Sequence, residues 1–271
     1  MTIIVKQNVL KDLAVKDVMR RQVLRLPEDA TIEKNINFLI KYKLNALLLT
    51  AKKNEPTGVV SKTDIMSAYY ASLPIESPAR DIMSSPPLFC GADDSLESAL
   101  DKMRAEGIYR LYARERASQS VVGVLAYPDV VGLLYLYCSR CEYSLVNRIR
   151  KKLETDEVSR FRVKDVMTPT VRSFRENDSL LTIMEGLSAY RFGAVLITGE
   201  NDRAVGVVSK TDLILAYAHG VSSSDSARTV MFSPVLSCDE TEFLEGAIRT
   251  MIFSEVHRLF VHRGDPQNIV G

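Results

Sequence analysis

An internal duplication constrains the fold of this chain more than any other feature of its sequence. Residues 58–64 read GVVSKTD, and the same letters return at residues 206–212, an offset of 148 positions. The offset also relates the pattern V-x-D-V-M at residues 15–19 to residues 163–167. A weaker echo, GVLAYPD, stands at residues 123–129. These repeats predict four copies of one small unit.

A copy of about 60 residues has only a small core, so we expect the copies to be stabilised by pairing. Clefts between paired copies are natural places for a ligand. The copies are predicted at residues 11–72, 75–138, 163–220 and 225–271, with a connecting helix at residues 139–162.

The first copy shows an order of local signals that the other copies repeat. Thr31 precedes apolar residues at the spacing of an amphipathic helix, and β-rich runs follow at residues 44–50 and 57–60. Ser61 then precedes a second helical pattern. The predicted fold class is α+β, with the order β-α-β-β-α in each copy. Pairs are expected to associate through apolar helix faces, giving a flat disc and a homodimer.

The composition is that of an ordinary globular protein, with 46% apolar residues, 25% charged residues and a net charge of +1. A net charge this small provides little electrostatic attraction for the phosphates of a nucleic acid. No run approaches the roughly 20 apolar residues of a membrane span. The 4 cysteines have no framework spacing, which favours reduced thiols. The sequence therefore predicts a cytoplasmic protein that binds neither nucleic acid nor membrane.

The opening V-x-D-V-M and the closing G-h-h-S-x-x-D, where h is apolar, resemble the CBS domain family over nearly the whole chain. The resemblance implies that the domains work as pairs whose clefts bind AMP, ADP, ATP, NAD or S-adenosylmethionine. It also implies regulation of a protein target rather than catalysis, with the adenosine compound as a regulatory ligand and no catalytic cofactor.

The repeated motif has a chemistry of its own. If Ser61 and Ser209 end a strand and begin a helix, each hydroxyl lies beside backbone N–H groups and the positive end of a helix dipole, where a phosphate is stabilised. Asp64 and Asp212 follow one turn later, and a carboxylate accepts hydrogen bonds from a ribose diol. The alternative is a capping box, in which both side chains only satisfy the start of the helix.

The resemblance extends to cations. In the gamma subunit of AMP-activated protein kinase, basic residues before the second strand of one copy reach the nucleotide held by the other. The matching positions here are Arg110 for the 58–64 motif and His257 with Arg258 for the 206–212 motif. Arginine suits phosphate through its planar fork of donors, although a surface ion pair is the alternative for either arginine.

The family also implies that backbone of the opening strand frames the adenine, at residues 20–22 for the first pair, with the 58–64 motif, and at residues 168–170 for the second pair, with the 206–212 motif. In the second copy Ala126 replaces the serine and Asp129 remains, so we expect a nucleoside at most. The predicted nucleotide-binding residues are Arg20, Arg21, Gln22, Ser61, Thr63, Asp64, Arg110, Asp129, Thr168, Pro169, Thr170, Ser209, Thr211, Asp212, His257 and Arg258.

Two other functions stay open on the sequence alone. Cys138 and Cys141 have the C-x-x-C spacing of a redox or zinc sensor, although one pair supplies only half of a tetrahedral site. Cys90 and Cys238 are expected to pack as small apolar residues. An interaction scaffold with unoccupied clefts is the other alternative.

The fourth copy is shorter than the second at its C-terminal end. Residues 270–271 match residues 122–123, after which the second copy continues with a strand and a closing helix. We therefore expect the natural protein to continue past Gly271 or a partner to cover the apolar surface that this helix would bury.

Overall fold

The computed structural model describes residue 10, residues 12–140 and residues 161–271; for residues 134–140 it describes the backbone. The chain divides into a smaller unit, made of Met1–Leu24 and Leu88–Val158, and a larger unit, made of Arg25–Pro87 and Ser159–Gly271. The smaller unit holds most of the second copy together with the opening segment of the first, and the larger unit holds the rest of the first copy, the opening segment of the second, and the third and fourth copies. The predicted connecting helix lies almost wholly outside the described residues.

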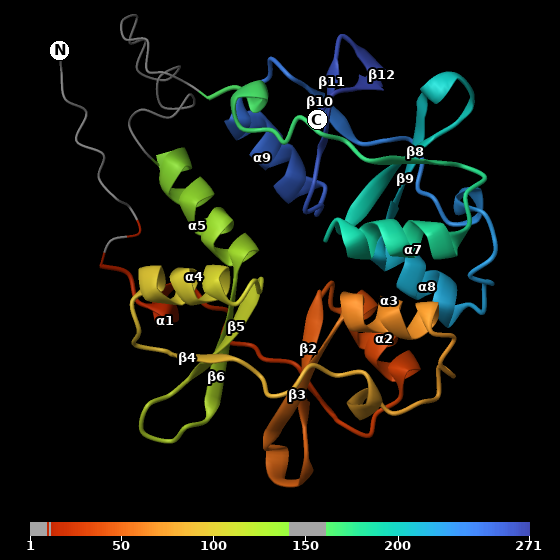
Figure 1. The fold of residues 1–271 in the computed structure, drawn as a ribbon. Coiled ribbons are helices and arrows are strands. Elements are labelled where there is room, and N and C mark those ends of the chain that lie inside the picture. Colours follow the sequence, from red (N-terminus) through yellow and green to blue (C-terminus); the bar gives the residue numbers. More distant parts are fainter. Residues whose placement is uncertain (1–9, 11, 141–160) are drawn as a thin grey trace, which may run out of the picture. The chain divides into compact units, whose positions relative to one another are not determined.

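Each copy contributes a short series of strands and helices (Figure 1). In the larger unit the first copy consists of β1 (Arg25–Pro27), α2 (Ile32–Lys41), β2 (Ala46–Thr50), β3 (Pro56–Ser61) and α3 (Lys62–Tyr70). The third copy consists of β7 (Ser173–Arg175), α7 (Leu180–Ala189), β8 (Ala194–Thr198), β9 (Ala204–Ser209) and α8 (Lys210–Ala218). The fourth consists of β10 (Ser237–Asp239), α9 (Leu244–Phe253), β11 (Phe260–Arg263) and β12 (Asp265–Ile269). The smaller unit contains α1 (Val15–Val18), β4 (Phe89–Gly91), α4 (Leu96–Ala105), β5 (Arg110–Arg114), β6 (Val121–Ala126) and α5 (Tyr127–Arg140).

The sheets repeat the duplication residue by residue. Within the described residues each copy has one three-stranded sheet, whose first two strands are parallel and whose last two are antiparallel. Ala46 pairs with Ser61 in the first copy, and Ala194 pairs with Ser209 in the third, each position shifted by the same offset. The predicted α+β class and element order are confirmed.

In three copies the helix after the first strand has a serine or threonine as its N-cap residue. The Oγ1 of Thr31 accepts a hydrogen bond from the Lys34 backbone N–H at 3.2 Å, and Ser95 and Ser179 cap α4 and α7 in the same way. Along α2 the side chains of Ile32, Ile36 and Leu39 are fully buried, which is the apolar stripe expected from the sequence.

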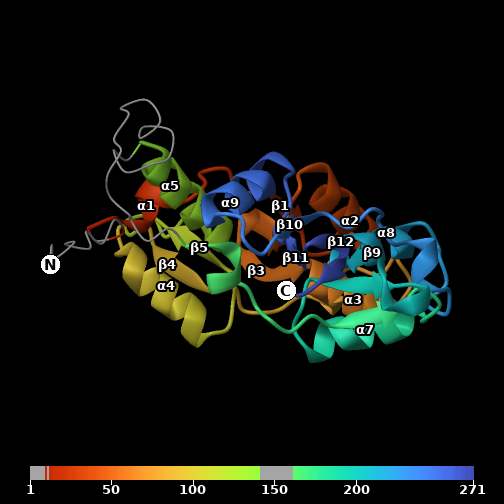
Figure 2. The ribbon, with the colours of Figure 1, turned by 90° about the horizontal axis from the view of Figure 1, so that it is seen from above.

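The first and third copies pack together through their helices. α3 lies against α7 and α8, and Met66 and Tyr69 of α3 belong to one core with Leu180, Ile183 and Leu187 of α7. This packing is the association through apolar helix faces that the sequence predicts. Figure 2 shows β12 of the fourth copy beside β9 of the third, a contact that the chain also makes along the two strands.

The helix interface also has a reciprocal pair of tyrosines. The rings of Tyr69 and Tyr217 stack with centroids 5.0 Å apart. The Tyr69 hydroxyl donates to the Val221 carbonyl at 2.7 Å, and the Tyr217 hydroxyl donates to the Leu73 carbonyl. The contact therefore has a local two-fold symmetry, because each copy gives the other the same hydrogen bond.

The opening segment of one copy crosses to the motif strand of another. In the larger unit Ser84 forms an isolated antiparallel β-bridge with Val59 of β3, and Phe232 forms one with Val207 of β9. In the smaller unit Arg20 bridges Val124 of β6. We call these residues, and the segments that hold them, bridging residues and bridging segments. Glycine makes the approach possible: a Cβ on Gly58 would lie 2.3 Å from the sulfur of Met83.

Candidate functional site

Both complete motifs lie where a strand ends and a helix begins, as predicted. Ser61 ends β3 and caps α3, and Ser209 ends β9 and caps α8. At the 206–212 motif the Ser209 hydroxyl accepts hydrogen bonds from the Thr211 and Asp212 N–H groups at 3.2 and 3.4 Å. Asp212 Oδ2 in turn accepts from the Ser209 N–H at 2.7 Å and from its hydroxyl at 2.6 Å. The 58–64 motif has the same contacts. The capping-box alternative is therefore present at both.

The capping box uses only one oxygen of each aspartate. Asp212 Oδ1 accepts no hydrogen bond from any described residue, and Asp64 Oδ1 has a single contact, with the Ser84 hydroxyl at 3.4 Å. A carboxylate oxygen has lone pairs for more than one donor. A capping role and a contact with a ligand hydroxyl are therefore compatible on the same aspartate.

The structure brings Arg258 to the start of α8. A Cβ placed on Gly193 would lie 2.3 Å from a guanidinium nitrogen of Arg258, so the arginine lies directly on the glycine backbone. The Gly193 carbonyl accepts a hydrogen bond from the Lys210 N–H at 3.0 Å, and Lys210 is the first residue of α8. Arg258 and the neighbouring His257 are both exposed. The predicted grouping of the 206–212 motif with Arg258 thus has a geometric basis.

The hydroxyl of the threonine in each complete motif accepts a hydrogen bond from a lysine of the other motif. Lys62 Nζ donates to Thr211 Oγ1 at 2.8 Å, and Lys210 Nζ donates to Thr63 Oγ1 at 2.8 Å. Each threonine therefore receives a proton donor from the motif of the other copy.

Asp129 has a different environment in the smaller unit. Its Oδ2 accepts from the Ala126 N–H at 2.9 Å, and its Oδ1 lies 2.9 Å from Nε of Arg20. Burial raises the pKa of the Asp129 carboxyl, while the positive charges of Arg20 and Arg110 oppose that rise. A nucleoside at this position would have to compete with Arg20. Arg110 begins β5 of this unit, whereas Ser61 and Asp64 belong to the larger unit, so their grouping stays a prediction.

Sequence reasoning missed the segments that lie beside the motif strands. It assigned residues 168–170 to the 206–212 motif, but the residue that bridges β9 there is Phe232, which is 65% exposed. It assigned residues 20–22 to the 58–64 motif, but Arg20 bridges β6, and Ser84 bridges β3. The Thr168 carbonyl instead lies near Gly271, at 3.2 Å from a Cβ placed on that glycine. Met83 and Met231 repeat at the offset just before the bridging residues, so the sequence marks the two segments as equivalent but does not say which motif strand each one contacts.

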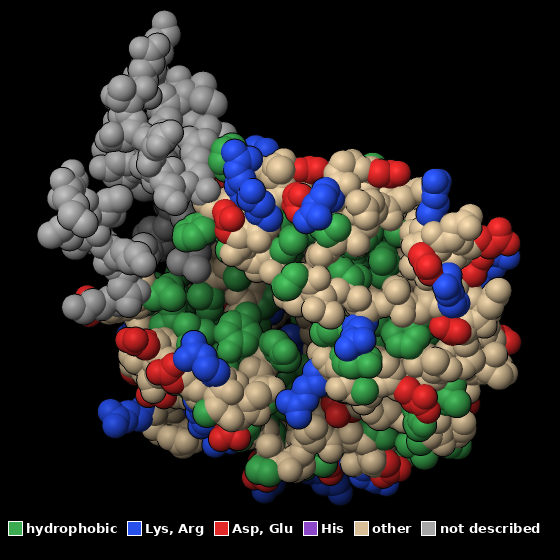
Figure 3. Space-filling model, turned by 45° about the horizontal axis from the view of Figure 1, so that its top comes forward, with side chains coloured by type: hydrophobic (Ala, Val, Ile, Leu, Met, Phe, Trp, Pro, Cys, Tyr) green, Lys and Arg blue, Asp and Glu red, His purple; other side chains and the backbone are tan. Residues whose placement is uncertain are grey.

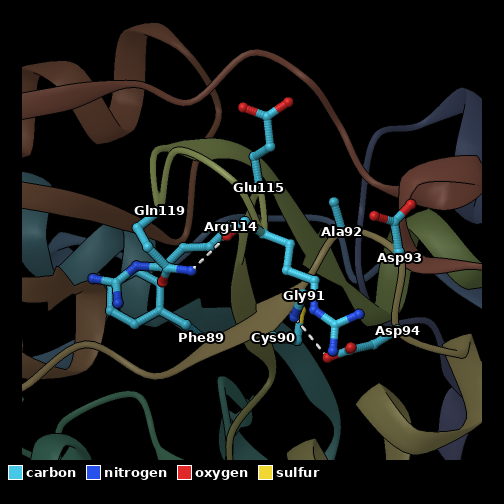
Figure 4. Close-up of a pocket in the computed structure, with 10 residues that line it drawn as sticks. Phe89, Cys90, Gly91, Ala92, Asp93, Asp94, Arg114, Glu115 and Gln119 are labelled. Atoms are coloured by element: carbon cyan, nitrogen blue, oxygen red, sulfur yellow. Dashed lines mark hydrogen bonds between the residues drawn. The ribbon is translucent and has the colours of Figure 1, made fainter.

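A cavity of about 370 Å³ lies in the second copy, at the end of the sheet opposite to Asp129 (Figure 4). Its walls include β4, the turn after β4 and the end of β5, and the guanidinium of Arg114 lies 3.4 Å from the ring centre of Phe89. Three carboxylates and two arginines line it. None of the predicted site residues is among them.

The cysteines that the structure describes fit the packing role. Cys90 and Cys238 are buried, and burial raises the pKa of each thiol to about 11. Cys141 and the side chain of Cys138 lie outside the described residues, so the C-x-x-C sensor stays untested. Among the residues that the structure describes, no group of three or more His, Cys, Asp or Glu side chains is arranged to hold a metal ion.

The described surface carries both signs of charge. On the face seen in Figure 3, basic and acidic side chains are interspersed over the part of the chain that the structure describes. None of the described helices has the length and apolar character needed to cross a bilayer.

Comparisons with known proteins agree with the resemblance in the sequence. The CBS domain family matches residues 15–71, 79–135 and 163–219, together more than half of the chain. The uncharacterised protein MJ1225 of Methanocaldococcus jannaschii is 20% identical over 204 residues, covering 75% of this chain and 70% of that protein.

Solved structures share the fold. The crystal structure of MJ1225, a protein proposed as an archaeal homologue of g-AMPK, aligns with a TM-score of 0.75 and 16% identity over 96% of both chains. An uncharacterised conserved protein from Pyrococcus horikoshii aligns with a TM-score of 0.58 and 15% identity, over 96% of this chain and 95% of that one. The fourth copy, which the family match does not include, is recognised by its sheet.

Proposed function

The chain belongs to the CBS domain family, and on this premise we propose that it binds an adenine nucleotide at the 206–212 motif and signals its occupancy to a protein partner. Paired CBS domains are regulatory ligand-binding modules. We propose AMP, ADP or ATP as the regulatory ligand, with NAD and S-adenosylmethionine as other adenosine compounds to be tested. The role proposed is regulatory rather than catalytic.

Two observations at the start of α8 carry the proposal: the second carboxylate oxygen of Asp212, Oδ1, and the nearby guanidinium of Arg258. The carboxylate oxygen is not used by the capping box and suits a ribose hydroxyl. The guanidinium lies beside the first residue of α8, where the helix dipole also favours a phosphate. Phe232, exposed beside β9, offers a ring on which a base can stack.

The 58–64 motif is proposed as a second site of lower affinity. Its Asp64 Oδ1 already has a contact with the Ser84 hydroxyl, and the segment beside β3 supplies a serine where the other motif has Phe232. Ser61, Thr63 and Asp64 would hold the ligand there. The cytoplasmic location and the homodimer expected from the sequence remain predictions.

Calorimetric titration of Asp212→Asn tests the proposal. Asparagine keeps an oxygen for the capping box but removes the charge, so AMP binding should weaken by about tenfold or more, and Asp64→Asn should have a smaller effect. Asp178→Asn is the matched control, because Asp178 Oδ2 also accepts a backbone N–H three residues earlier, at 2.7 Å, outside the motif. If neither Asp212→Asn nor Asp64→Asn changes the affinity for any of the five compounds, the motifs are only caps.

A second candidate function is supported by the completeness of the capping boxes: an interaction scaffold that binds no small molecule. A thermal-shift screen separates the two, because a ligand that binds only the folded state raises the melting temperature. A scaffold predicts no shift with AMP, ADP, ATP, NAD or S-adenosylmethionine. Repeating the screen with zinc and with reductant also tests the Cys138 and Cys141 sensor.

A further inference from the structure

Two lysines cross between the motifs of the first and third copies. Lys62 belongs to the 58–64 motif but its ammonium bonds Thr211, and Lys210 belongs to the 206–212 motif but its ammonium bonds Thr63, both at 2.8 Å. The residues of the two bonds are related by the offset of the duplication. The crossing is therefore a symmetric feature of the interface between the copies, in line with the reciprocal tyrosine bonds.

Each crossing places a positive charge at the first turn of a helix from the other copy. Thr211 is two residues after the capping Ser209, and its own N–H donates to the Ser209 hydroxyl at 3.2 Å. The side chain of Thr211 thus connects the Lys62 ammonium to the capping box of α8. By the same geometry Lys210 lies beside the capping box of α3, where the Thr63 N–H donates to the Ser61 hydroxyl.

Arg258 adds a second positive charge near Lys210. The guanidinium of Arg258 lies on Gly193, whose carbonyl accepts from the Lys210 N–H. Burial lowers the pKa of the Lys210 ammonium, the positive charge of Arg258 lowers it further, and Asp64 raises it. Lys210 and Arg258, from two copies, therefore bring positive charge close together near the start of α8, and a bound anion there would stabilise both.

We propose that Lys62 contacts the phosphate of a nucleotide bound at the 206–212 motif, and that Lys210 does the same for a nucleotide at the 58–64 motif. Each lysine acts on the site of the other copy rather than on its own. The inference rests on the proposed nucleotide binding and adds to it a phosphate contact made across the interface. The base and ribose are held by one copy's motif and its bridging segment, and the phosphate by a lysine from the other copy.

The arrangement couples the two sites. An ammonium has three N–H donors, so a lysine that bonds a threonine of the other copy also has donors for a phosphate bound there. Occupancy of either site therefore adds a bond to the contact between the first and third copies, which gives the regulatory signal a structural path.

The test uses Lys62→Gln in an Asp64→Asn background. Asp64→Asn weakens the 58–64 site, so the remaining calorimetric binding, of about one AMP per chain, reports the 206–212 site. Lys62→Gln should then lower the AMP affinity of that remaining site about tenfold. It should leave the affinity for adenosine, which has no phosphate, within about twofold. Lys102→Gln is the matched control, because Lys102 Nζ also makes one 2.8 Å hydrogen bond, to the Phe89 carbonyl.

The outcomes separate this inference from the proposed function. If Asp64→Asn binds AMP and Lys62→Gln leaves that affinity unchanged, the lysine makes no phosphate contact in the other copy and the inference is wrong, while nucleotide binding stands. Equal weakening of AMP and adenosine also overturns it, because the lysine would then only support the interface. If the wild-type chain binds neither compound, the proposed function itself fails.

Discussion

The 206–212 motif and its counterpart at residues 123–129 hold an aspartate in the same backbone setting. Asp212 Oδ2 accepts from the Ser209 N–H at 2.7 Å, and Asp129 Oδ2 accepts from the Ala126 N–H at 2.9 Å. Their second oxygens differ, because Arg20 is ion-paired to Asp129 Oδ1 while no described residue bonds Asp212 Oδ1. One position of the fold can thus be an internal ion pair in one copy and a ligand acceptor in another.

The bridging segment accounts for the difference. Arg20 bridges β6 and reaches Asp129, whereas Phe232 bridges β9 and has no charge to offer Asp212. The residue that decides the chemistry of each aspartate is therefore far from it in sequence. The chemistry of the aspartate therefore depends on the bridging residue as well as on the S-x-x-D pattern.

Converting one motif into the other should have the largest effect. Ser209→Ala with Phe232→Arg gives the 206–212 motif the equivalents of Ala126 and of the bridging Arg20, so the new arginine should pair with Asp212. Loss of the hydroxyl and of the carboxylate acceptor together should weaken AMP binding by about 100-fold or more in a calorimetric titration.

Ser179→Ala is the control for this conversion, because Ser179 caps α7 by accepting from the Thr182 N–H at 3.2 Å. It should lower the melting temperature by loss of a cap without changing AMP affinity. If the converted motif still binds AMP within threefold of wild type, the serine and the bridging residue do not decide whether the aspartate accepts a ligand.

A smaller effect is expected from moving Arg258 while keeping its charge. Gly193→Ala places a methyl group 2.3 Å from the present guanidinium position, and the end of this flexible side chain must shift away. AMP affinity should fall a few-fold with adenosine affinity unchanged, and the melting temperature should stay close to wild type. Gly132→Ala is the control, since nothing lies within 4 Å of the added atom. Unchanged AMP binding by Gly193→Ala would remove Arg258 from the site.

The smallest expected effect is on the titration of Asp129. Its pKa lies above the ordinary 3.8, chiefly through burial, and Arg20 holds the rise in check. Arg20→Gln should raise this pKa further, as measured by carboxyl carbon NMR.

The sign of the linked stability change follows from that shift. A carboxyl with a raised folded pKa binds more protons in the folded state, so its contribution is greatest below 3.8 and is lost as pH rises through the folded pKa. Arg20→Gln should therefore lose more stability than wild type between acid and neutral pH. A lowered Asp129 pKa in Arg20→Gln would contradict the ion pair.

The repeated sequence predicts the local structure well. The offset, the apolar spacing and the hydroxyl caps predict the element order, and they place Ser61 and Ser209 at the junction of strand and helix, where the structure has them. These features depend on residues within one turn or one hairpin, so they are present in the local sequence.

Which segments meet could not be predicted from the sequence. Met19, Met83 and Met231 precede equivalent bridging residues, and the sequence alone does not say which motif glycine each one contacts. The same holds for Lys62 and Thr211, whose bond depends on how α3 packs against α8. When copies are alike, local signals fit several pairings, and the choice is made by tertiary packing.

The central claim is that Asp212 is a nucleotide ligand as well as a cap. A crystal structure of the chain with AMP measures this most directly. We predict a ribose hydroxyl within hydrogen-bonding distance of Asp212 Oδ1, with the phosphate against Arg258 and the Lys62 ammonium. AMP bound instead in the cavity beside Phe89 and Arg114, with the 206–212 motif untouched, would contradict it.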